Sequence, residues 1–259
     1  MSEHADTIRR AFTEQAEAFE DPARNQSFRS DTVGWLLEEL PLRASDVALE
    51  VACGTGHIAR ALAPHVAVVV GVDATQAMLD VGHAQARSEG VHNVVFQVGD
   101  ASALPFPAES FEIAACRFAV HHFRDPGTVV AEVGRCLRPG GRLLVIDILA
   151  DERPPAAELQ NHLERLRDPS HTRMLDRSGL VSLLDCAGLQ ARALPSRLKS
   201  RPLAPWLEQT HTSPAVVQEI TGAFAAELDG GPITGFRPER REGEWWFSHR
   251  YGGVLGLRG

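Results

Sequence analysis

A glycine-rich loop between an apolar run and a helix-like segment is the first feature of this sequence that could do chemistry. The loop, Glu50-Val51-Ala52-Cys53-Gly54-Thr55-Gly56, directly follows the apolar residues 47–49. Small residues let a ligand lie against the backbone, and a helix that begins there offers backbone N–H groups. The loop therefore predicts a ligand site, although a glycine turn can also serve only to close a strand.

Two carboxylates follow the next two apolar runs. Asp73 ends the run 68–72, and Asp100 follows the run 94–98 in the segment Gly99-Asp100-Ala101. Asp73 can accept hydrogen bonds from both hydroxyls of a ribose, or it can cap the helix that starts at Ala74. Asp100 can accept from the exocyclic amine of adenine, or it can be a turn residue. Three such sites after three consecutive strands favour a nucleoside ligand at the open edge of a sheet.

Histidines supply the candidate proton acceptors, because their ordinary pKa lies near neutral pH. His121 and His122 lie in the loop after the fourth apolar run, and His171 lies in the turn 167–171. Neighbouring residues point in different directions, so we expect at most one of His121 and His122 to face a substrate. The pair can equally serve to fix its loop, and the turn of His171 can be held by its own Asp168 and Ser170.

The elements that position these residues are short strands alternating with helices. This order predicts right-handed βαβ units and an open, mostly parallel sheet. The expected strands are residues 47–51, 66–72, 94–98, 113–116 and 143–149, and the expected helices between them are 57–63, 74–88 and 127–137.

The two ends of the chain add further elements. A helix over 6–19 places Gln15 and Phe19 on one face, and a second helix through Val33, Leu36, Leu37 and Leu40 ends at Pro41. Beyond residue 149 we expect helices at 155–167, 178–187 and 214–228, a strand at 189–194, and a strand-like segment 245–257 broken by Gly252 and Gly253. Gly188 is expected to cap the helix 178–187.

Composition narrows the class of protein. Asp plus Glu outnumber Lys plus Arg by 34 to 26, a net charge of −8, which disfavours nucleic acid and anionic membranes as partners. The four cysteines form no CxxC pair, and the spacing of the histidines and aspartates does not resemble a ligand set, so we expect no metal. The charged N-terminus and the lack of a long apolar stretch predict a soluble, cytoplasmic protein.

Five segments in order resemble the motifs of class I S-adenosylmethionine-dependent methyltransferases. They are ALEVACGTGHIARAL, GVDATQAML, VGDASALPFPAESFE, FEIAACRFAVHHFRDP and LRPGGRLLVID, and they span about residues 45–150. The HHF-x-DP segment is similar to the ubiquinone/menaquinone-biosynthesis-like branch of small-molecule methyltransferases. Ala52 stands where relatives have the first loop glycine, and Phe19 stands where they often have tyrosine.

The resemblance implies a Rossmann-like α/β fold with a seven-stranded, mostly parallel sheet, an antiparallel last strand, helices on both faces and helical lid insertions. It implies one domain over 1–259, with an N-terminal cofactor cap at 1–30, a core at 31–150 and lid insertions at 151–178 and 196–244. S-adenosylmethionine would be the cofactor, and a small molecule would be the substrate. The aromatic residues of the last insertion could bind a planar acceptor, or they could pack in the core or in a homodimer contact.

Carried over residue by residue, the resemblance assigns the cofactor site. Glu50 and the backbone of Ala52, Cys53, Gly54, Thr55 and Gly56 would hold the methionine part, together with the backbone of Arg117. Asp73 would bind the ribose, with Ala74 and Met78 beside the adenine, and Asp100 and Ala101 would contact the adenine edge. Gln15 and Phe19 would cover the cofactor. We add His122 to this set, and His121 and His171 as candidate catalytic residues.

Two other functions fit part of the pattern. Gly54-Thr55-Gly56-His57-Ile58-Ala59 followed by Asp73 also matches a nicotinamide dinucleotide site. Glu50 before the loop and the single tyrosine, Tyr251, which has no lysine four residues on, argue against that oxidoreductase. A methyltransferase fold without methyl transfer, either a binding module or a cyclase-like enzyme, would carry the same motifs.

Overall fold

In the computed structural model, which describes residues 3–20, 34 and 38–259, the strands form one sheet of nine. Seven of them follow the order β3-β2-β1-β4-β5-β9-β6, and β7 and β8 also pair with β9. The pairs among β1 to β5 are parallel, and every pair that includes β9 is antiparallel. The strands are β1 (Val47–Val51), β2 (Val68–Asp73), β3 (Val94–Val98), β4 (Phe111–Arg117), β5 (Leu137–Leu149), β6 (Leu189–Ala193), β7 (Arg197–Pro202), β8 (Glu239–Arg241) and β9 (Glu244–Arg258).

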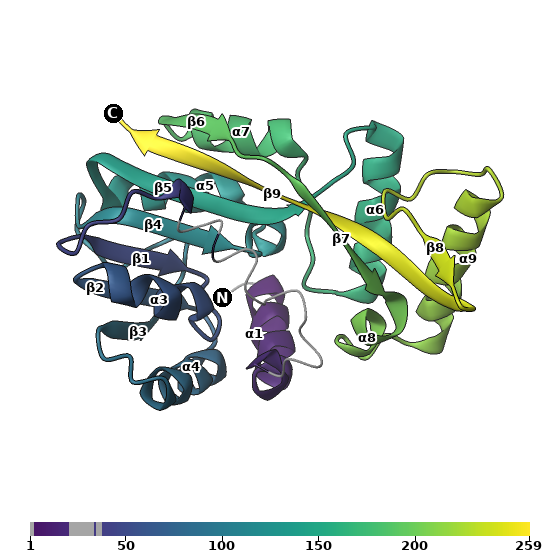
Figure 1. Ribbon diagram of the computed structural model, residues 1–259, viewed down its shortest axis with the longest axis horizontal. Helices are drawn as coiled ribbons and strands as arrows, with labels where there is room; N and C mark the ends of the chain where they lie inside the picture. Colours follow the sequence, from purple (N-terminus) through teal and green to yellow (C-terminus); the bar gives the residue numbers. More distant parts are fainter. Residues whose placement is uncertain (1–2, 21–33, 35–37) are drawn as a thin grey trace.

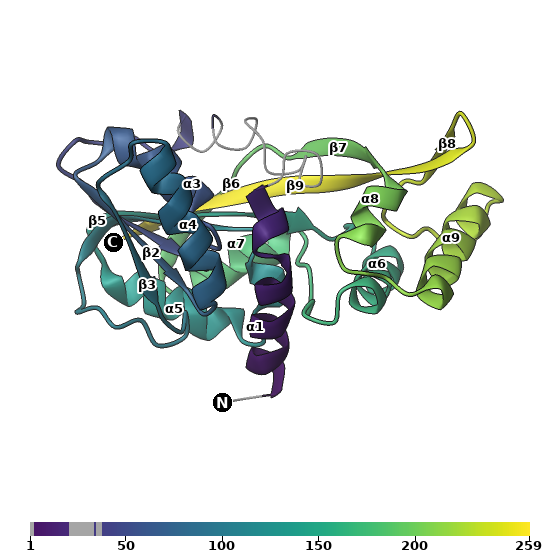
Figure 2. The same ribbon diagram turned by 90° about the horizontal axis from the view of Figure 1, so that it is seen from below.

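The helices connect these strands and cover both faces of the sheet (Figures 1 and 2). They are α1 (Glu3–Gln15), α3 (His57–Leu62), α4 (Gln76–Ser88), α5 (Pro126–Cys136), α6 (Pro154–Arg167), α7 (Arg177–Cys186), α8 (Leu203–Glu208) and α9 (Pro214–Leu228), with short 3-10 turns η1 (Glu17–Glu20), η3 (Ala63–His65) and η4 (Val120–His122). The expected Rossmann-like methyltransferase fold is confirmed. Gly188 has a left-handed φ of 79° just after α7, as predicted for a cap.

Alternate residues of the strands build two cores on opposite faces. Along β1, Ala48 packs with α3 residues such as Ile58, whereas Leu49 packs with residues of α5 and α7 such as Val133 and Leu184. All of these side chains are fully or almost fully buried. Because strands covered on both faces must be apolar throughout, this burial explains the nearly continuous apolar runs in the sequence.

A third core lies at the far end of β9, away from the parallel strands. It consists mainly of large aromatic side chains from α8, α9, β9 and their connections, including Trp206, Phe224, Phe236 and Phe247. Figure 1 shows β9 running from the main sheet to this second cluster of helices. In both views α1 lies between α4 and α8, so the N-terminal helix lies where the two parts meet.

Two predictions about the C-terminal third are wrong. Segment 245–257 is not broken, because Gly252 and Gly253 belong to β9 and pair with Asp147 and Ile146 of β5. A Cβ on Gly252 would lie 2.4 Å from Leu149 Cδ1, so glycine there permits close strand packing. The segment 196–244 is not purely helical, since it contributes β7 and β8 as well as α8 and α9.

Some boundaries also differ. Strand β5 begins at Leu137, earlier than the expected 143, and α4 begins at Gln76 rather than at residue 74. The expected helix through Val33, Leu36 and Leu37 falls on residues outside the described part of the chain. Within the described part, no helix is both long and apolar enough to cross a membrane.

Candidate active site

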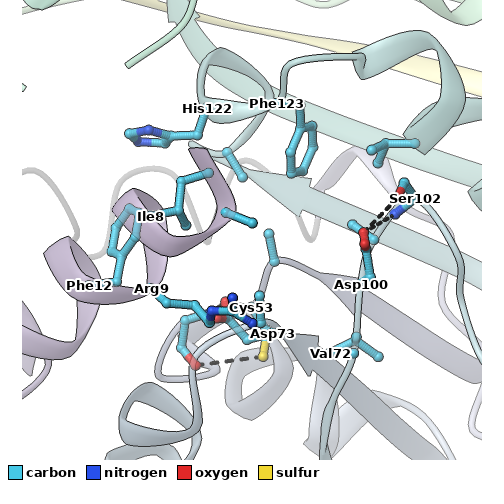
Figure 3. A pocket seen from close by; sticks show the side chains of 18 of the residues that line it. Ile8, Arg9, Phe12, Cys53, Val72, Asp73, Asp100, Ser102, His122 and Phe123 are labelled. Carbon is cyan, nitrogen blue, oxygen red and sulfur yellow. Dashed lines mark hydrogen bonds between the residues drawn. The ribbon is translucent and has the colours of Figure 1, made fainter. Parts of the chain in front are cut away.

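A cavity of about 560 Å³ opens at the carboxyl ends of β1, β2 and β4, under α1. Figure 3 shows Ile8, Arg9 and Phe12 on one side of it, facing Asp100 and Ser102 on the other. Its wall contains most of the residues predicted to bind a cofactor: Phe19, Glu50, Ala52, Cys53, Gly54, Thr55, Asp73, Ala74, Asp100, Ala101, Arg117 and His122. The topology thus brings the three predicted strand-end sites together in one place.

The glycine loop owes its shape to left-handed backbone at every second residue. Ala52, Gly54 and Gly56 have φ angles of 51°, 55° and 73°. Glycine adopts this region freely, whereas alanine costs about 1 kcal/mol there. Ala52 is therefore a mildly strained member of the loop, and Gly54 is the position where the backbone faces the cavity without a side chain.

Gly56 has a structural part in this loop rather than a place on the cavity wall. A Cβ at Gly56 would lie 2.2 Å from Cε1 of Phe96, a residue of β3. Its N–H donates to the carbonyl of Cys53 at 2.8 Å, which closes the turn before α3. Glycine is required here by the packing of the loop on the sheet.

Asp73 ties the end of β2 to the glycine loop. Its Oδ2 accepts from the backbone N–H of Gly54 at 2.8 Å, and its Oδ1 accepts from Thr75 at 2.9 Å. Burial raises the pKa of this carboxyl above its ordinary value, although the hydrogen bonds oppose the shift. The N-cap of α4 is Thr75 and not Asp73, so Asp73 remains directed at the loop and the cavity.

Asp100 presents one carboxylate oxygen to its own turn. Its Oδ1 accepts from the backbone N–H of Ser102 at 2.8 Å and from the Ser102 hydroxyl at 2.7 Å. Both residues line the cavity, as Figure 3 shows. The turn holds the carboxylate in place, and its second oxygen can accept from a ligand amine.

Opposite charges face the inner end of the cavity. Glu50 is 3% exposed, and its Oε2 accepts from the backbone N–H of Ala59 in α3 at 2.7 Å. Burial raises the pKa of Glu50 to about 7, and burial lowers the pKa of Arg117 to about 10. A carboxylate and a guanidinium together suit the ammonium and carboxylate of an amino acid moiety.

The N-terminal segment covers the glycine loop through a side-chain network. Arg60 of α3 donates to both carboxylate oxygens of Glu20 at 3.1 Å and to the carbonyl of Thr55 at 2.5 Å. The Thr55 hydroxyl also donates to Glu20. Phe19 lies next to Gly54, with Cε1 3.7 Å from where a Cβ would be. Residues 19 and 20 therefore sit directly on the loop.

A second, larger cavity of about 850 Å³ adjoins the first. Arg167 and Asp168 reach it from the end of α6, whereas Arg201 and Trp206 reach it from β7 and α8. Tyr251 of β9 completes this wall. Segments from both expected insertions thus meet here, at the open side of the sheet.

Four rings belong to the walls of both cavities: Phe12, Phe19, Phe118 and His122. Phe12 packs edge-on against His122, with ring centroids 5.2 Å apart, and lies 6.5 Å from Phe19. Phe118 has a left-handed φ of 54°, an unusual state for an aromatic residue, and its N–H donates to Ile146 at 2.8 Å. Such strained residues cluster at functional sites. We call these four residues the aromatic boundary.

His121 lies on the wall of the second cavity and pairs with a buried aspartate. Its Nδ1 is 2.5 Å from Oδ1 of Asp147, and its backbone N–H donates to Oδ2 at 3.1 Å. Burial lowers the pKa of His121, but the Asp147 carboxylate outweighs it, so the pKa is raised overall. Its other nitrogen, Nε2, makes no hydrogen bond with the described residues and can meet a cavity ligand.

His122 and His171 are held differently. His122 also lines the second cavity. Both His121 and His122 therefore face this cavity, whereas at most one of them was expected to face a substrate. The Nδ1 of His122 lies 3.1 Å from the carbonyl oxygen and from the hydroxyl oxygen of Ser170. His171 lies on neither cavity wall, because its Nε2 is bound to Asn161 at 3.0 Å and its ring stacks 5.3 Å from His121. Burial lowers the pKa of His122 to about 4 and that of His171 to about 3.

Two other predicted residues lie elsewhere than expected. Gln15 lines the second cavity and not the first, because it lies near the C-terminal end of α1 beyond Phe12. Met78 is 1% exposed in the first turn of α4 and is not among the residues that line the first cavity. Among the residues that the structure describes, no group of three or more metal-ligating side chains is placed to hold an ion.

Sequence reasoning missed most of the second cavity. Arg201 and Tyr251 come from the paired strands β7 and β9, in which Arg197 lies opposite Tyr251 and Arg201 lies opposite Phe247. Asp147 is not among the residues that the sequence predicts for the site. Because Asp147 lies 26 residues from His121 in the sequence, no local pattern indicates their contact. The one available signal is the acidic residue inside the apolar strand LLVIDIL, since a buried carboxylate needs a polar partner.

Comparison with known proteins identifies the family of this chain. A family model described as "Methyltransferase domain" matches residues 49–145. The uncharacterized methyltransferase YcgJ of Bacillus subtilis (strain 168) is 43% identical over 162 residues, which span 62% of this chain and 63% of that protein. The crystal structure of YcgJ superposes with a TM-score of 0.82 at 33% identity and covers 88% of this chain and 97% of that one.

Other relatives differ in what they do. Demethylmenaquinone methyltransferase of Deinococcus radiodurans is 38% identical over 121 residues, 46% of this chain and 48% of that protein. The [4+2]-cyclase SpnF shares only the fold, with 20% identity, a TM-score of 0.60, and coverage of 88% of this chain and 85% of SpnF. These findings favour S-adenosylmethionine over a nicotinamide dinucleotide as the cofactor. The chain belongs to the class I S-adenosylmethionine-dependent methyltransferases.

Proposed function

We propose that this chain transfers a methyl group from S-adenosylmethionine in the first cavity to a nucleophilic atom of a small molecule in the second. The observation that carries the proposal is the aromatic boundary, since Phe12, Phe19, Phe118 and His122 belong to both cavity walls. A reaction between two molecules in adjoining cavities needs such a common border. The proposed chemistry and acceptor class go beyond family membership.

The residues of the first cavity fit the cofactor. Asp73 would take the ribose hydroxyls and Asp100 the adenine amine, and Glu50 with Arg117 would hold the charged ends of the methionine part. Gly54 leaves backbone space that a Cβ would reduce. Phe19 and Glu20 would close over the bound molecule. Bound S-adenosylmethionine supplies a methyl group activated by a positively charged sulfur.

Alignment is the main contribution expected from the boundary. Holding two reactants at near-attack distance can lower a barrier by about 7–11 kcal/mol. The rings of Phe12 and Phe118 would exclude water and leave one path between the cavities. His122, kept neutral by burial and held by Ser170, would add a fixed wall rather than a proton acceptor.

His121 is the proposed general base. Its Nδ1 is bound to Asp147, which fixes the ring and leaves Nε2 as the acceptor toward the second cavity. An acceptor O–H or N–H would lose its proton to Nε2 as its lone pair attacks the methyl carbon and displaces the sulfur, which would leave as the neutral thioether of S-adenosylhomocysteine. Asp147 would act as a positioning residue that stabilises the charged imidazolium. His171, bound to Asn161, would support the stack and touch no reactant.

The test compares His121→Gln with His162→Gln, an exposed histidine of α6 that serves as the control. With any accepted substrate, H121Q is expected to lower kcat by about 100- to 10,000-fold and leave the Kd for S-adenosylhomocysteine unchanged. H162Q should behave as wild type. Full activity in H121Q would remove the base from the proposal, and absence of S-adenosylhomocysteine with every acceptor would favour a non-transferring protein.

A further inference from the structure

We propose that Thr172 is a positioning residue that keeps the His121 imidazole against the Asp147 carboxylate. Its hydroxyl does so by holding the backbone of the turn that carries His121. The proposal rests on the proposed function for the role of His121, and it deepens that function by naming a residue that lies on neither cavity wall. It follows from the contacts between the 168–173 segment, which comes directly after α6, and η4.

The Thr172 hydroxyl lies between two backbone carbonyl groups of a distant segment. Its Oγ1 is 2.8 Å from the carbonyl oxygen of His121 and 2.9 Å from that of Phe123. A hydroxyl has one hydrogen, so the two carbonyl oxygens share it. These contacts join residues that are 51 and 49 positions apart in the sequence, whereas threonine hydroxyls commonly bond to neighbouring backbone groups. The hydroxyl therefore ties η4 to the 168–173 segment instead of bracing its own turn.

The backbone of His121 is held from two sides. On one side, its carbonyl oxygen also accepts the backbone N–H groups of Thr172 at 2.8 Å and of Arg173 at 3.2 Å. On the other side, its backbone N–H donates to Asp147 Oδ2 at 3.1 Å, and its Nδ1 lies 2.5 Å from Asp147 Oδ1. Because Thr172 holds the same residue that Asp147 holds, a displacement of the His121 carbonyl moves the ring relative to the carboxylate.

The contact with Asp147 is the one that such a displacement changes most, because hydrogen bonds weaken steeply with distance and angle. Burial lowers the pKa of His121, and Asp147 is the group that raises it most. Other titratable groups that face the ring come from α6, from the 168–173 segment and from η4: Glu164, Asp168, His171 and His122. A ring that moves away from Asp147 is left with the effect of burial, so its pKa should fall.

Substitutions of Thr172 separate its hydroxyl from its bulk. Valine has the shape of threonine with a methyl group in place of the hydroxyl. A carbon atom needs about 3.3 Å or more from a carbonyl oxygen, whereas this site offers 2.8 and 2.9 Å. Thr172→Val therefore removes the hydrogen bond and also displaces the two carbonyl groups. Thr172→Ala removes the hydroxyl without that overlap, and Thr172→Ser keeps the hydroxyl.

Thr221 supplies a matched control. Its hydroxyl also contacts two backbone carbonyl groups, those of Val217 at 2.8 Å and Gln218 at 3.2 Å. Both belong to its own helix, α9, and Thr221 lies on neither cavity wall. Thr221→Val should therefore lower stability without an effect on His121. Urea unfolding of each variant measures that loss.

The experiment is an NMR titration of protein that carries ¹⁵N-labelled histidine rings, recorded from pH 5 to 9 with saturating S-adenosylhomocysteine. The signals of His121 are assigned by their absence in H121Q. We expect a pKa above the ordinary 6.5 for His121 in the wild type. In T172V the protonation constant of His121 should fall about three- to tenfold, the effect of one net hydrogen bond, and T172A should change it in the same direction. T172S and T221V should keep the wild-type value.

An unchanged pKa of His121 in both T172V and T172A would overturn the proposal. An equal fall in T172S would overturn it as well, because the hydroxyl is retained there. An equal fall in T221V would do the same, because the change would then follow from lost stability alone. Since the titration needs no turnover, an unchanged pKa would leave the proposed methyl transfer untouched, and absence of methyl transfer would leave the titration result standing.

Discussion

His121 Nδ1 lies 2.5 Å from Asp147 Oδ1, at the point where the η4 turn contacts strand β5. The contact joins a loop residue of the second cavity to a carboxylate that is 2% exposed in the middle of the sheet. The carboxylate also accepts the backbone N–H groups of His121 and Ile148, so its position is fixed by the strand itself. Asp147 thus sets the orientation and the proton affinity of the His121 imidazole, which lines the second cavity.

The first prediction concerns the pH dependence of turnover. Since the pKa of His121 is raised above its ordinary 6.5, kcat should increase as pH rises through that higher value, where the imidazole becomes neutral. Asp147→Asn removes the charge that opposes burial, so the acidic limb of the kcat profile should move to lower pH. At its plateau kcat should be lower by about 10- to 100-fold, because a misplaced ring is a poorer base.

The measurement is kcat from pH 5 to 9 for both proteins, with Asp80→Asn on the exposed face of α4 as the control. NMR titration of ring-labelled histidine would give the pKa of His121 directly. An acidic limb that stays in place in D147N would contradict the assignment of that limb to His121.

The second prediction concerns Glu50. Burial raises its pKa from 4.5 to about 7, so the neutral form is favoured in the folded chain. The neutral Glu50 side chain makes its full contribution to the stability of the folded chain below pH 4.5, and this contribution is lost as the pH rises through 7, where the buried carboxyl becomes charged. Without cofactor, Glu50→Gln should therefore be more stable than wild type at pH 8 by about 2 kcal/mol, with the advantage shrinking toward pH 5.

The same substitution should weaken ligand binding, because an amide cannot pair with the ammonium of the methionine part. We expect the Kd for S-adenosylhomocysteine at pH 8 to rise about tenfold in E50Q. Urea unfolding and calorimetric titration at pH 5 and 8 test both effects. A uniform loss of stability across that pH range would contradict the raised pKa.

The third prediction separates two glycines of one loop. Gly54→Ala should cost about 1 kcal/mol of stability, because its φ of 55° is left-handed and its Cβ meets Phe19 only at 3.7 Å. Its main effect should be weaker binding of S-adenosylhomocysteine. Gly56→Ala should cost about 2–4 kcal/mol, because its Cβ would overlap the ring of Phe96.

Urea unfolding with calorimetric titration distinguishes the two. In the G56A background, Phe96→Ala should recover part of the lost stability, since it removes the overlapping ring. Equal stability losses in G54A and G56A would argue against the packing given for this loop.

The fourth prediction concerns the cover over the cofactor site. Glu20→Gln removes the charge that binds Arg60, so residues 19 and 20 should hold the glycine loop less firmly. Release of S-adenosylhomocysteine should become roughly tenfold faster, with little change in global stability. The control is Glu89→Gln, which removes the other acidic partner of Arg60 and leaves Glu20 in place. Stopped-flow displacement gives the rates, and equal acceleration in both variants would contradict a specific role for Glu20.

The cofactor half of the molecule could be predicted from the sequence because its signals are local. Strand-terminating Asp73, the left-handed glycines and the turn of Asp100 each follow from a few neighbouring residues, and the parallel order then brings them together. Ala52 stands where relatives have the first loop glycine, and its left-handed φ of 51° shows that alanine is a mildly strained substitute there.

The second cavity could not be predicted, because its contacts join distant segments. Asp147 of β5 contacts His121, which lies 26 residues earlier in the chain, and Arg201 and Tyr251 reach the second cavity from the paired strands β7 and β9. Gly252 and Gly253 were predicted to break the last strand, whereas Gly252 lets β9 pack closely against Leu149, and β9 also reaches the third core. Gln15 lines the second cavity instead of the first. This could not be predicted, because a helical period shows which residues share a face of the helix but not which part of the protein that face contacts.

The most direct test of the proposed methyl transfer follows the methyl group itself. The protein is incubated with S-adenosylmethionine carrying a trideuteromethyl group and with a panel of small molecules that offer O–H or N–H nucleophiles, and the products are identified by mass spectrometry. We expect the whole trideuteromethyl group to appear on an acceptor in equal amount with S-adenosylhomocysteine, and we expect H121Q to lose this transfer. Conversion of an acceptor without the label, or no labelled product from any acceptor while S-adenosylhomocysteine binds normally, would contradict it.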